Sequence, residues 1–401
     1  MAAVLESITF NPWDPAFRAN PYPYYRPLVA GPPYLLNLFI PMALVGRYAE
    51  AAAIIRDHER FSSAPPYSPF MEERLRVFGD APRIVFSDPP IHTRLRRVVS
   101  RAFTPKRIKE LEPRIREFTR ELLDRAAAAG EFEAMAALAN PLPVMVIAEM
   151  LGVPTGDYEK FKHWSDAVID SDNTPPGAPL PAPVKQAFAA LRDYFIEEIA
   201  QRRRNPGQDL VSVLVAAREQ SEALSEEELI AFVVLLLLAG NETTTNLIGN
   251  GLLALGRNPH ELERLRCAPE LMPRAIEEML RYDCPVQSTA RYPKSDIEIA
   301  GVTIAANTPT FVIVAAANRD PAQFPDPDRF DVAREPNNHL AFGEGIHYCL
   351  GATLARMEGA IAIGEVIRCF PDVHLPDPEA PREYKGSYFL RGLSALPMML
   401  E

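Results

Sequence analysis

A single thiol in a glycine-rich turn places the strongest constraint on this chain. Cys349 lies in residues 342–351, which read Phe-Gly-Glu-Gly-Ile-His-Tyr-Cys-Leu-Gly and lead into a stretch typical of a helix. Glycines let the backbone approach a flat group closely and direct N–H groups at a sulfur atom. A thiolate is a strong axial ligand of haem iron. We therefore expect Cys349 to be the metal ligand, with Phe342, Gly343 and Gly351 beside a haem b.

Two other interpretations of this cysteine compete with the haem ligand. A free cysteine is often only a small buried apolar residue, and a glycine turn is compatible with that role. A zinc site built on His347 and Cys349 is excluded, because no second pair of Cys or His lies nearby at ligand spacing. The complete spacing Phe-x-x-Gly-x-x-x-Cys-x-Gly, followed by a helical stretch, favours the haem ligand.

Composition limits the class of protein. The formal net charge of −11 disfavours nucleic acid or an anionic membrane as the main partner. Residues 1–12 lack the basic start and apolar run of a signal peptide. The longest apolar run, residues 229–240, is shorter than the roughly 20 residues that a membrane span needs. No disulfide pattern is seen among the four cysteines, which are Cys267, Cys284, Cys349 and Cys369. We expect a cytoplasmic protein with no membrane insertion.

Hydrophobic periodicity and breakers predict a mainly α fold with small sheets. The length of 401 residues alone favours about two domains, although no repeat or Gly/Ser linker divides the chain. Helices are expected at residues 105–129, 141–151, 156–168, 184–204, 225–256, 259–268 and 273–282. Short strands are expected at residues 34–38, 40–45, 297–299, 302–304 and 310–315. The proline-rich residues 170–183 separate two helices, and they are either a surface loop or a lid over a pocket.

The helix expected at residues 225–256 contains an unusual polar insertion. Ser225 and Glu228 have the spacing of a capping box, and residues 229–239 are apolar on every face. Ala239-Gly240-Asn-Glu242-Thr243 then places a carboxylate and a hydroxyl in a stretch that must be buried. Such groups are costly in a core unless they have partners or a role. Either Glu242 and Thr243 relay protons, or the threonines bond to their own helix and bend it.

Basic residues follow a double proline and open another helix. His92 and Arg96 share one helix face, which suits the two propionates of a haem, although a solvated basic face is the usual fate of such a pair. A basic patch is expected around them, and it comprises Arg94, Arg97, Arg101, Lys106, Arg107 and Lys109. On an acidic protein, such a patch would attract an acidic redox partner. Further along the chain, Glu278 and Arg281 form a helical pair that Arg329 could complete as a buried cluster.

Taken in order, these motifs resemble the cytochrome P450 family, specifically its soluble bacterial members. The resemblance runs from about Asn11 to the C-terminus. It rests on residues 239–244, 278–281, 327–330 and 342–351, with support from residues 88–96 and 391–397. Residues 33–45 depart from the family pattern, because they lack the Gly or Asp turn and the Trp of its first hairpin.

The resemblance implies a fold and a set of site residues. It implies a single domain over residues 1–401, with a small sheet at about 30–65, a helical core at 88–285 and haem between the long helix and the loop at 342–351. This replaces the two-domain expectation from length. Cofactor contacts are implied for His92, Arg96, Ala239, Gly240, Arg291, Phe342, Gly343, His347, Cys349 and Gly351. Glu242 and Thr243 match the catalytic acid–alcohol pair, and Glu278, Arg281 and Arg329 match the structural cluster. A substrate pocket is implied at Val85, Leu235, Ala239, Val286, Gln287, Thr289 and Leu390.

The activity implied is that of a haem-thiolate monooxygenase acting on a lipophilic fatty acid, terpenoid, steroid or polyketide. This sequence contains no flavin or nicotinamide fingerprint. Electrons from NAD(P)H would therefore arrive through a reductase and a ferredoxin- or flavodoxin-type donor at the basic face. We expect a monomer with no nucleic-acid partner. A peroxide-driven peroxygenase is an alternative, against which the intact Glu242–Thr243 pair argues, and a non-catalytic haem sensor is another. Further pocket candidates are Phe70, Phe78, Phe86, Trp164, Phe188 and Phe389.

Overall fold

The computed structural model describes residues 10–37, 40–66, 81–101, 103–169, 171, 174, 178–217, 224–385 and 389–400. Two of the aromatic pocket candidates, Phe70 and Phe78, lie outside these ranges. The lid prediction for residues 170–183 falls partly on residues that are not described, which are 170, 172, 173 and 175–177.

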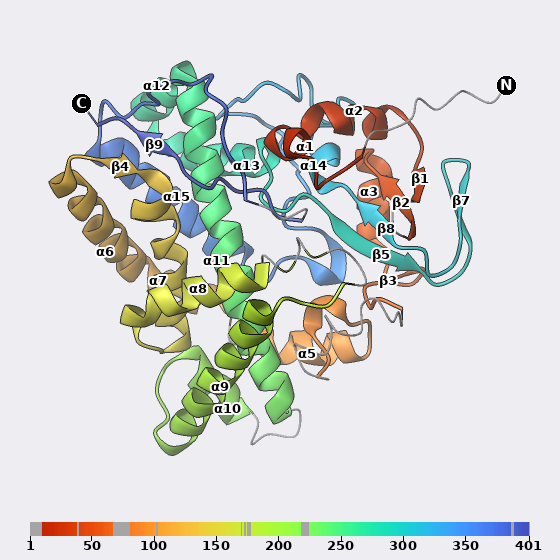
Figure 1. The fold of residues 1–401 in the computed structure, drawn as a ribbon, viewed down its shortest axis with the longest axis horizontal. Helices are drawn as coiled ribbons and strands as arrows, with labels where there is room; N and C mark the ends of the chain where they lie inside the picture. The colour runs from red at the N-terminus through yellow and green to blue at the C-terminus, as the bar shows by residue number, and fades with distance from the viewer. Residues whose placement is uncertain are drawn as a thin grey trace.

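Helices make up most of the described chain, and they fill the left and lower parts of the view in Figure 1. The helices before the longest one are α1 (Pro15–Ala19), α2 (Tyr22–Ala30), α3 (Tyr48–Arg56), α5 (Ile91–Ser100), α6 (Pro105–Ala129), α7 (Pro141–Leu151), α8 (Tyr158–Ile169), α9 (Ala182–Arg204) and α10 (Leu210–Ala217). The others are α11 (Glu226–Arg257), α12 (Pro259–Cys267), α13 (Met272–Tyr282), α14 (Val314–Ala317) and α15 (Ala352–Cys369). The prediction of a mainly helical protein with small sheets is confirmed.

The strands of the main sheet gather on the right of Figure 1, whereas β4 and β9 lie at the upper left. The main sheet has the order β1-β2-β8-β5-β3. Its strands are β1 (Tyr34–Asn37), β2 (Pro41–Val45), β8 (Thr310–Val312), β5 (Thr289–Pro293) and β3 (Phe61–Ser62). The β2–β8 pair is parallel and joins the N-terminal hairpin to a late part of the chain, with Val45 opposite Val312. Two small pairs complete the strands: β4 (Phe132–Glu133) with β9 (Pro397–Met398), and β6 (Ile297–Ile299) with β7 (Val302–Ile304).

The predicted strands were partly wrong. The strand expected at residues 310–315 ends at Val312, and after Ile313 the Val-Ala-Ala-Ala run of residues 314–317 forms α14. Alanine favours helix, and the N–H of Ala315 donates to Gln287 instead of extending the sheet. Strand β5 was not predicted. Within the atypical segment, β1 and β2 nevertheless pair as antiparallel strands, with Leu35 opposite Ala43.

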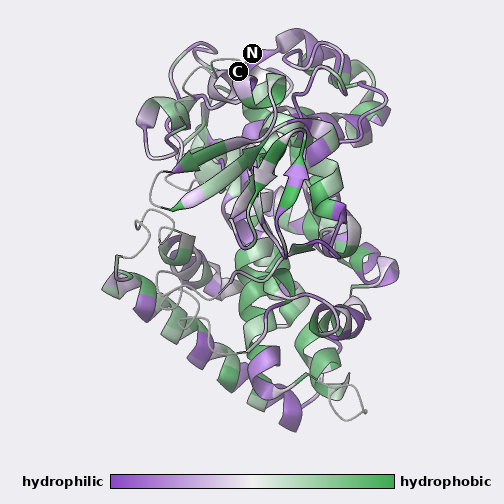
Figure 2. Cartoon of the chain, turned by 90° about the vertical axis from the view of Figure 1, so that its right-hand side faces the viewer, coloured by the Kyte–Doolittle hydropathy of each residue, from purple (hydrophilic) through white to green (hydrophobic). Residues whose placement is uncertain are grey.

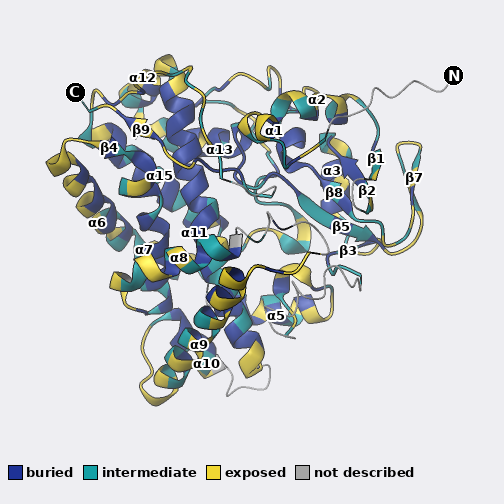
Figure 3. Cartoon of the chain, viewed as in Figure 1, coloured by how far each residue is buried: buried dark blue, intermediate teal, exposed yellow. Residues whose placement is uncertain are grey.

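The core is built around α11, which is helical throughout residues 226–257 and begins at the predicted capping box of Ser225 and Glu228. By length and composition α11 could cross a membrane, but 67% of its most apolar window is buried inside the fold. In Figure 3, α11, α13 and α15 are mostly dark blue, whereas the outer faces of α6 and α9 are exposed. Figure 2 shows the central helices as mostly apolar and places the hydrophilic residues on outer turns. The apolar run of α11 is therefore explained by packing within the protein.

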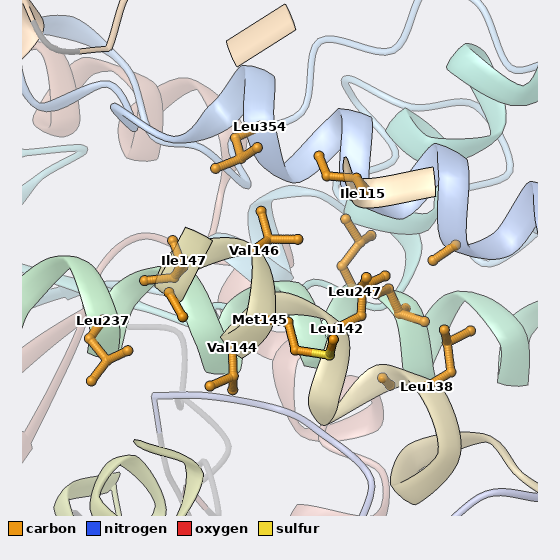
Figure 4. Close-up of a cluster of buried hydrophobic side chains, with 14 of the residues drawn as sticks. Ile115, Leu138, Leu142, Val144, Met145, Val146, Ile147, Leu237, Leu247 and Leu354 are labelled. Atoms are coloured by element: carbon orange, nitrogen blue, oxygen red, sulfur yellow. The ribbon is translucent and has the colours of Figure 1, made fainter. Parts of the chain in front are cut away.

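Helix α7 lies between α11 and the layer formed by α6 and α15. Figure 4 shows Leu142 and Val146 of α7 among Ile115 of α6, Leu247 of α11 and Leu354 of α15. All five side chains belong to one buried apolar cluster. Burying a side chain of this size contributes roughly 1.5–3 kcal/mol. This packing fixes α11 in place, and with it the polar residues in its middle.

A buried ion cluster connects α13 to the loop before the cysteine. Glu278 and Arg281 are both fully buried, with Arg281 donating from Nε at 2.7 Å and from Nη2 at 2.8 Å. The third member is Arg334, whose Nε lies 3.1 Å from both oxygens of Glu278. The prediction of Arg329 in this position was wrong, because its side chain is 65% exposed and pairs with Asp331. Arg329 contributes its backbone carbonyl, which accepts from Arg281 and Arg334.

Removing one cation from this cluster should destabilise the fold. Arg334→Met leaves the fully buried carboxylate of Glu278 with one guanidinium, so we expect the free energy of unfolding to fall by about 3–5 kcal/mol. Arg329→Met is the matched control. Surface substitutions of this kind change the free energy of unfolding by less than about 0.5 kcal/mol. Urea denaturation measures both. Equal effects of the two variants would contradict the assignment of Arg334.

Candidate functional site: a thiol beside a cluster of cations

The cysteine loop leaves Cys349 exposed and directs backbone N–H groups at its sulfur. Cys349 is exposed, and its backbone N–H donates to the carbonyl of Phe342 at 2.9 Å, which closes the loop. Burial by the surrounding protein raises the pKa of the thiol, whereas the N–H groups of Gly351 and Ala352 act in the opposite direction by donating to the sulfur. Gly351 immediately precedes α15, so the sulfur faces a helix N-terminus.

Two glycines of the loop leave open space. Gly343 has a φ of +66°, the left-handed region that favours glycine. A Cβ built on Gly343 or on Gly351 would meet nothing within 4 Å. Gly345 differs, because a Cβ there would come within 3.2 Å of the backbone of Arg56 in α3. The loop is therefore packed on its α3 side and open at the two glycines that flank the sulfur.

Positive charge converges on this loop from three elements. His92 and Arg96 lie on α5, Arg291 lies on β5, and His347 lies in the loop itself. The rings of His92 and His347 have centroids 4.2 Å apart. Arg291 is 7% exposed, and its Nη1 donates to two neutral oxygens, Thr289 Oγ1 at 3.2 Å and the Ala290 carbonyl at 2.9 Å.

Among the described residues, Asp88 is the carboxylate that acts on His92, His347 and Arg291. Burial, followed by the charges of His92, Arg291 and Arg96, lowers the pKa of His347 to about 3. Burial, followed by the charge of Arg96, lowers the pKa of His92. Asp88 acts in the opposite direction, but its carboxylate already accepts from Ser62 and from the N–H of Ser63. The Nε2 atoms of His92 and His347 are buried without a hydrogen-bond partner. This arrangement fits an anionic group that receives hydrogen bonds here.

A metal ion at this site would need ligands besides protein side chains. Across the described ranges, no group of three or more His, Cys, Asp or Glu side chains is gathered in a way that could hold a metal ion. One accessible thiol, open glycines and a cluster of cations together fit a flat, metal-bearing and dianionic cofactor such as haem.

One face of α11 opens towards a space instead of the core. Leu235, Ala239 and Thr243 follow one another at helical spacing, and Ala239 is exposed although most of the helix around it is buried. The hydroxyl of Thr243 donates to the Ala239 carbonyl at 2.7 Å. Gly240, the residue after Ala239, is a further predicted cofactor contact, and its backbone lies close to α7. A Cβ on Gly240 would come within 2.5 Å of Ile147, so this glycine allows α7 to pack closely.

Glu242 is held by two lysines from distant parts of the chain. Its side chain is 2% exposed, with Lys162 Nζ of α8 at 3.2 Å and Lys385 Nζ of the C-terminal segment at 3.0 Å. Burial alone would raise the pKa of this carboxyl, but the charges of Lys385 and Lys162 outweigh burial and lower it. Glu242 is thus held ionised, and it ties α8, α11 and the C-terminal segment together.

The predicted pocket residues differ in their exposure. Val85 is 42% exposed and its neighbour Phe86 is 46% exposed, so both present apolar surface. Val286 pairs with Leu390 in an isolated bridge, and both are partly buried, as is Thr289. Gln287 is wrong as a pocket contact, because it is buried, donates to the Cys284 carbonyl at 2.6 Å and accepts from Tyr25 at 3.0 Å. Among the aromatic candidates, Phe188 is buried in the core of the helices.

Known proteins provide independent evidence. The family model described as Cytochrome P450 matches residues 36–268 and 269–394. The putative cytochrome P450 YjiB of Bacillus subtilis is 42% identical over 360 residues, which is 88% of each chain. The cytochrome P450 monooxygenase PikC of Streptomyces venezuelae is 40% identical over 95% of this chain and 91% of its own. The solved structure of PksS, the bacillaene polyketide synthase P450 of Bacillus subtilis, has a TM-score of 0.89 at 36% identity and covers 98% of this chain and 100% of its own.

The chain belongs to the cytochrome P450 family. It is therefore a cytochrome P450 monooxygenase, and the family uses a haem with a cysteine thiolate on the iron. The resemblance noted in the sequence is confirmed over nearly the whole chain. The P450 fold expected from it is confirmed by the structural match.

Three contributors to this P450 site were missed by sequence reasoning. Lys162 and Lys385 lie 80 and 143 residues from the carboxylate they hold, and lone lysines carry no spacing signal. Arg94 was expected to face solvent, but it forms an ion pair with Glu228 at the start of α11. Glu228 had been read only as part of a helix cap, and no sequence pattern linked it to α5.

The lysine pair makes stability depend on pH in a defined direction. Of the two lysines, Lys385 lowers the pKa of Glu242 more. The pKa of Glu242 should therefore rise in Lys385→Met. The wild-type carboxyl contributes stability that is present above its ordinary pKa of 4.5 and is lost as pH falls through its lower folded value. The gap in unfolding free energy between wild type and Lys385→Met should therefore widen as pH rises through this range, by about 1.4 kcal/mol per unit of pKa change.

Lys160→Met provides the control for this experiment. Lys160 lies on α8 two residues before Lys162 and is 61% exposed, and it pairs with Asp157. Its removal should shift the free energy of unfolding by the same amount across the pH range in which the Lys385→Met gap widens. A pH-independent gap for Lys385→Met would show that the lysine does not act on Glu242.

Proposed function

We propose that this P450 is a haem-thiolate monooxygenase in which Cys349 is the iron ligand. The observation that carries the proposal is the position of the accessible Cys349 sulfur, which receives two backbone N–H groups and lies beside a cluster of cations without matching acids. When bound, the haem supplies the activation of O₂. The roles that follow are those of the chain's own residues.

The cations fix the orientation of the cofactor. Arg96 and Arg291 bind the propionates, and the orphaned Nε2 atoms of His92 and His347 donate to the same carboxylates. This proposal explains the four side chains together, because two carboxylates would pair with the charges of Arg96 and Arg291 and accept hydrogen bonds from His92 and His347. Phe342, Gly343 and Gly351 border the cofactor, as does Ala239 on the opposite side.

Glu242 and Thr243 hold and move protons. Thr243 Oγ1 donates to its own helix, which leaves its lone pairs free to accept a proton donor in the space beside Ala239. Glu242 rests as a carboxylate between Lys162 and Lys385. It therefore accepts a proton before it can pass one on.

The substrate is a lipophilic small molecule. Val85, Phe86 and Leu235 present apolar surface, and Val286, Thr289 and Leu390 extend it at the C-terminal side. Relatives include a mycinamicin IV hydroxylase/epoxidase and a vitamin D(3) 25-hydroxylase, which supports a substrate of polyketide, terpenoid, steroid or fatty-acid type. Hydroxylation or epoxidation of such a molecule is the reaction proposed.

Electrons come from a ferredoxin- or flavodoxin-type carrier with its NAD(P)H-dependent reductase. Arg97, Arg101, Lys106 and Lys109 are exposed where α5 ends and α6 begins. The charge of Arg96, on the same helix as Arg97, acts on Cys349, so this basic surface lies close to the ligand loop. An acidic carrier would dock on it. We further propose that the chain works as a cytoplasmic monomer and as one domain over residues 1–401.

Oxygen-isotope labelling with a Thr243→Ala variant tests this function. Wild type should incorporate one atom of labelled O₂ into the product for each NAD(P)H consumed. Thr243→Ala should keep reductant consumption but form at least about tenfold less product and release peroxide, since general acid–base groups contribute roughly 10²–10⁴-fold. Product, NAD(P)H and peroxide are measured together.

Thr245→Val is the control, because the Thr245 hydroxyl is buried and donates to the Ala139 carbonyl at 2.9 Å. It should remain coupled. Unlabelled product formed at full rate from hydrogen peroxide without a carrier would contradict the monooxygenase proposal and support a peroxygenase. No product in either assay from a broad library of lipophilic compounds would support a haem sensor.

A further inference from the structure

A second network of charged and aromatic side chains lies on the α15 side of the cysteine loop. Arg356 of α15 donates to Glu277 of α13 through two bonds, from Nε at 2.6 Å and from Nη2 at 2.8 Å. Bidentate pairs of this kind fix the planar guanidinium in one orientation. Glu277 is the immediate neighbour of Glu278, so α13 anchors this network and the buried ion cluster with adjacent residues.

His339 completes the anchor. Its Nδ1 accepts the N–H of Ala341 at 3.2 Å, so the ring proton lies on Nε2, which donates to Glu277 at 3.1 Å. The His339 side chain is 3% exposed. Burial alone would raise the pKa of Glu277, but its bonds to Arg356 and His339 lower it to about 2. Glu277 is therefore a carboxylate at any pH at which the protein works.

The guanidinium of Arg356 faces the cysteine loop. Its Cζ lies 4.4 Å from the centroid of the Phe342 ring, and its Nη1 lies 3.1 Å from Tyr348 Oη. Phe342 receives the backbone N–H of Cys349, and Tyr348 is the residue before that cysteine. The pair Arg356–Glu277 is thus a fixed dipole with its positive end against the loop and its negative end on α13.

This dipole lies next to the residues that hold the sulfur. The Arg356 guanidinium contacts Phe342, whose carbonyl accepts the Cys349 N–H, and Tyr348, the neighbour of Cys349 in the chain. Arg96 is already engaged on the propionate side of the site. Arg356 has no such task, and its bonds within the described residues go to Glu277 and Tyr348.

We propose that Arg356 is a positioning residue that, held by Glu277 and His339, places a fixed positive charge behind Phe342 and so raises the reduction potential of the haem bound at Cys349. Reduction adds negative charge to the iron–thiolate unit, and a nearby cation stabilises the reduced form relative to the oxidised form. The proposal rests on the proposed function, because it requires thiolate-ligated haem.

The reduction potential of the haem-loaded protein tests this role, measured by spectroelectrochemical titration. Arg356→Met should shift the equilibrium about tenfold towards the oxidised form, which is a fall of about 59 mV for one electron. Arg356→Lys keeps the charge and should recover most of that shift. Arg368→Met is the matched control, because Arg368 lies on the same helix but pairs with Glu365 and is 63% exposed. Its potential should equal that of wild type.

Two results would overturn the proposal. One is an unchanged potential in Arg356→Met. The other is an Arg356→Lys potential as low as that of Arg356→Met, since packing rather than charge would then be responsible. The ferrous–CO spectrum of each variant separates these results from a failure of the proposed function. If wild type lacks the red-shifted band of a thiolate ligand, the proposed function fails. If the band is present and the potentials do not differ, only the role of Arg356 fails.

Discussion

Positive charge without a matching acid is the constraint on which the site depends. Arg96, Arg291, His92 and His347 meet beside one thiol, and Asp88, the carboxylate that acts on the last three, already accepts from two serine residues. Burying such groups together is costly, as the lowered pKa values of His92 and His347 record. Such an unfavourable free energy of burial is expected where a bound ligand offsets it. A dianionic haem with an iron for Cys349 would satisfy every one of these groups.

Buried carboxylates hold the elements that form this site. Glu278 is bound by Arg281 and Arg334, which fixes α13 against the loop that leads to Cys349. Glu242 is bound by Lys162 and Lys385, which fixes α11 against α8 and the C-terminal segment. In both cases two cations come from different parts of the chain. Losing one partner leaves a charge in a medium of low dielectric constant, so these contacts fix one arrangement of the helices around the space beside Ala239.

Much of the fold and part of the site could be predicted from the sequence. The capping box at Ser225 and the prolines that open α6 and α7 are local signals, and the helices begin where these signals indicate. Cys349, Glu242 and Thr243 stand in motifs of fixed spacing. Contacts between residues far apart in the chain leave no such pattern in the sequence. Arg329 and Arg334 look equivalent there, and only the turn of the loop decides which side chain reaches Glu278. The close approach of Ile147 to Gly240 could not be predicted either, because Ile147 belongs to another helix.

The ferrous–CO absorption spectrum tests the central claim, that the Cys349 thiolate binds the iron, most directly. Haem-loaded wild type should show the strongly red-shifted Soret band of a thiolate ligand. Cys349→Ser should lose that band, whereas Cys369→Ser, which alters a partly exposed thiol of α15, should keep it. Persistence of the red-shifted band in Cys349→Ser would contradict the account.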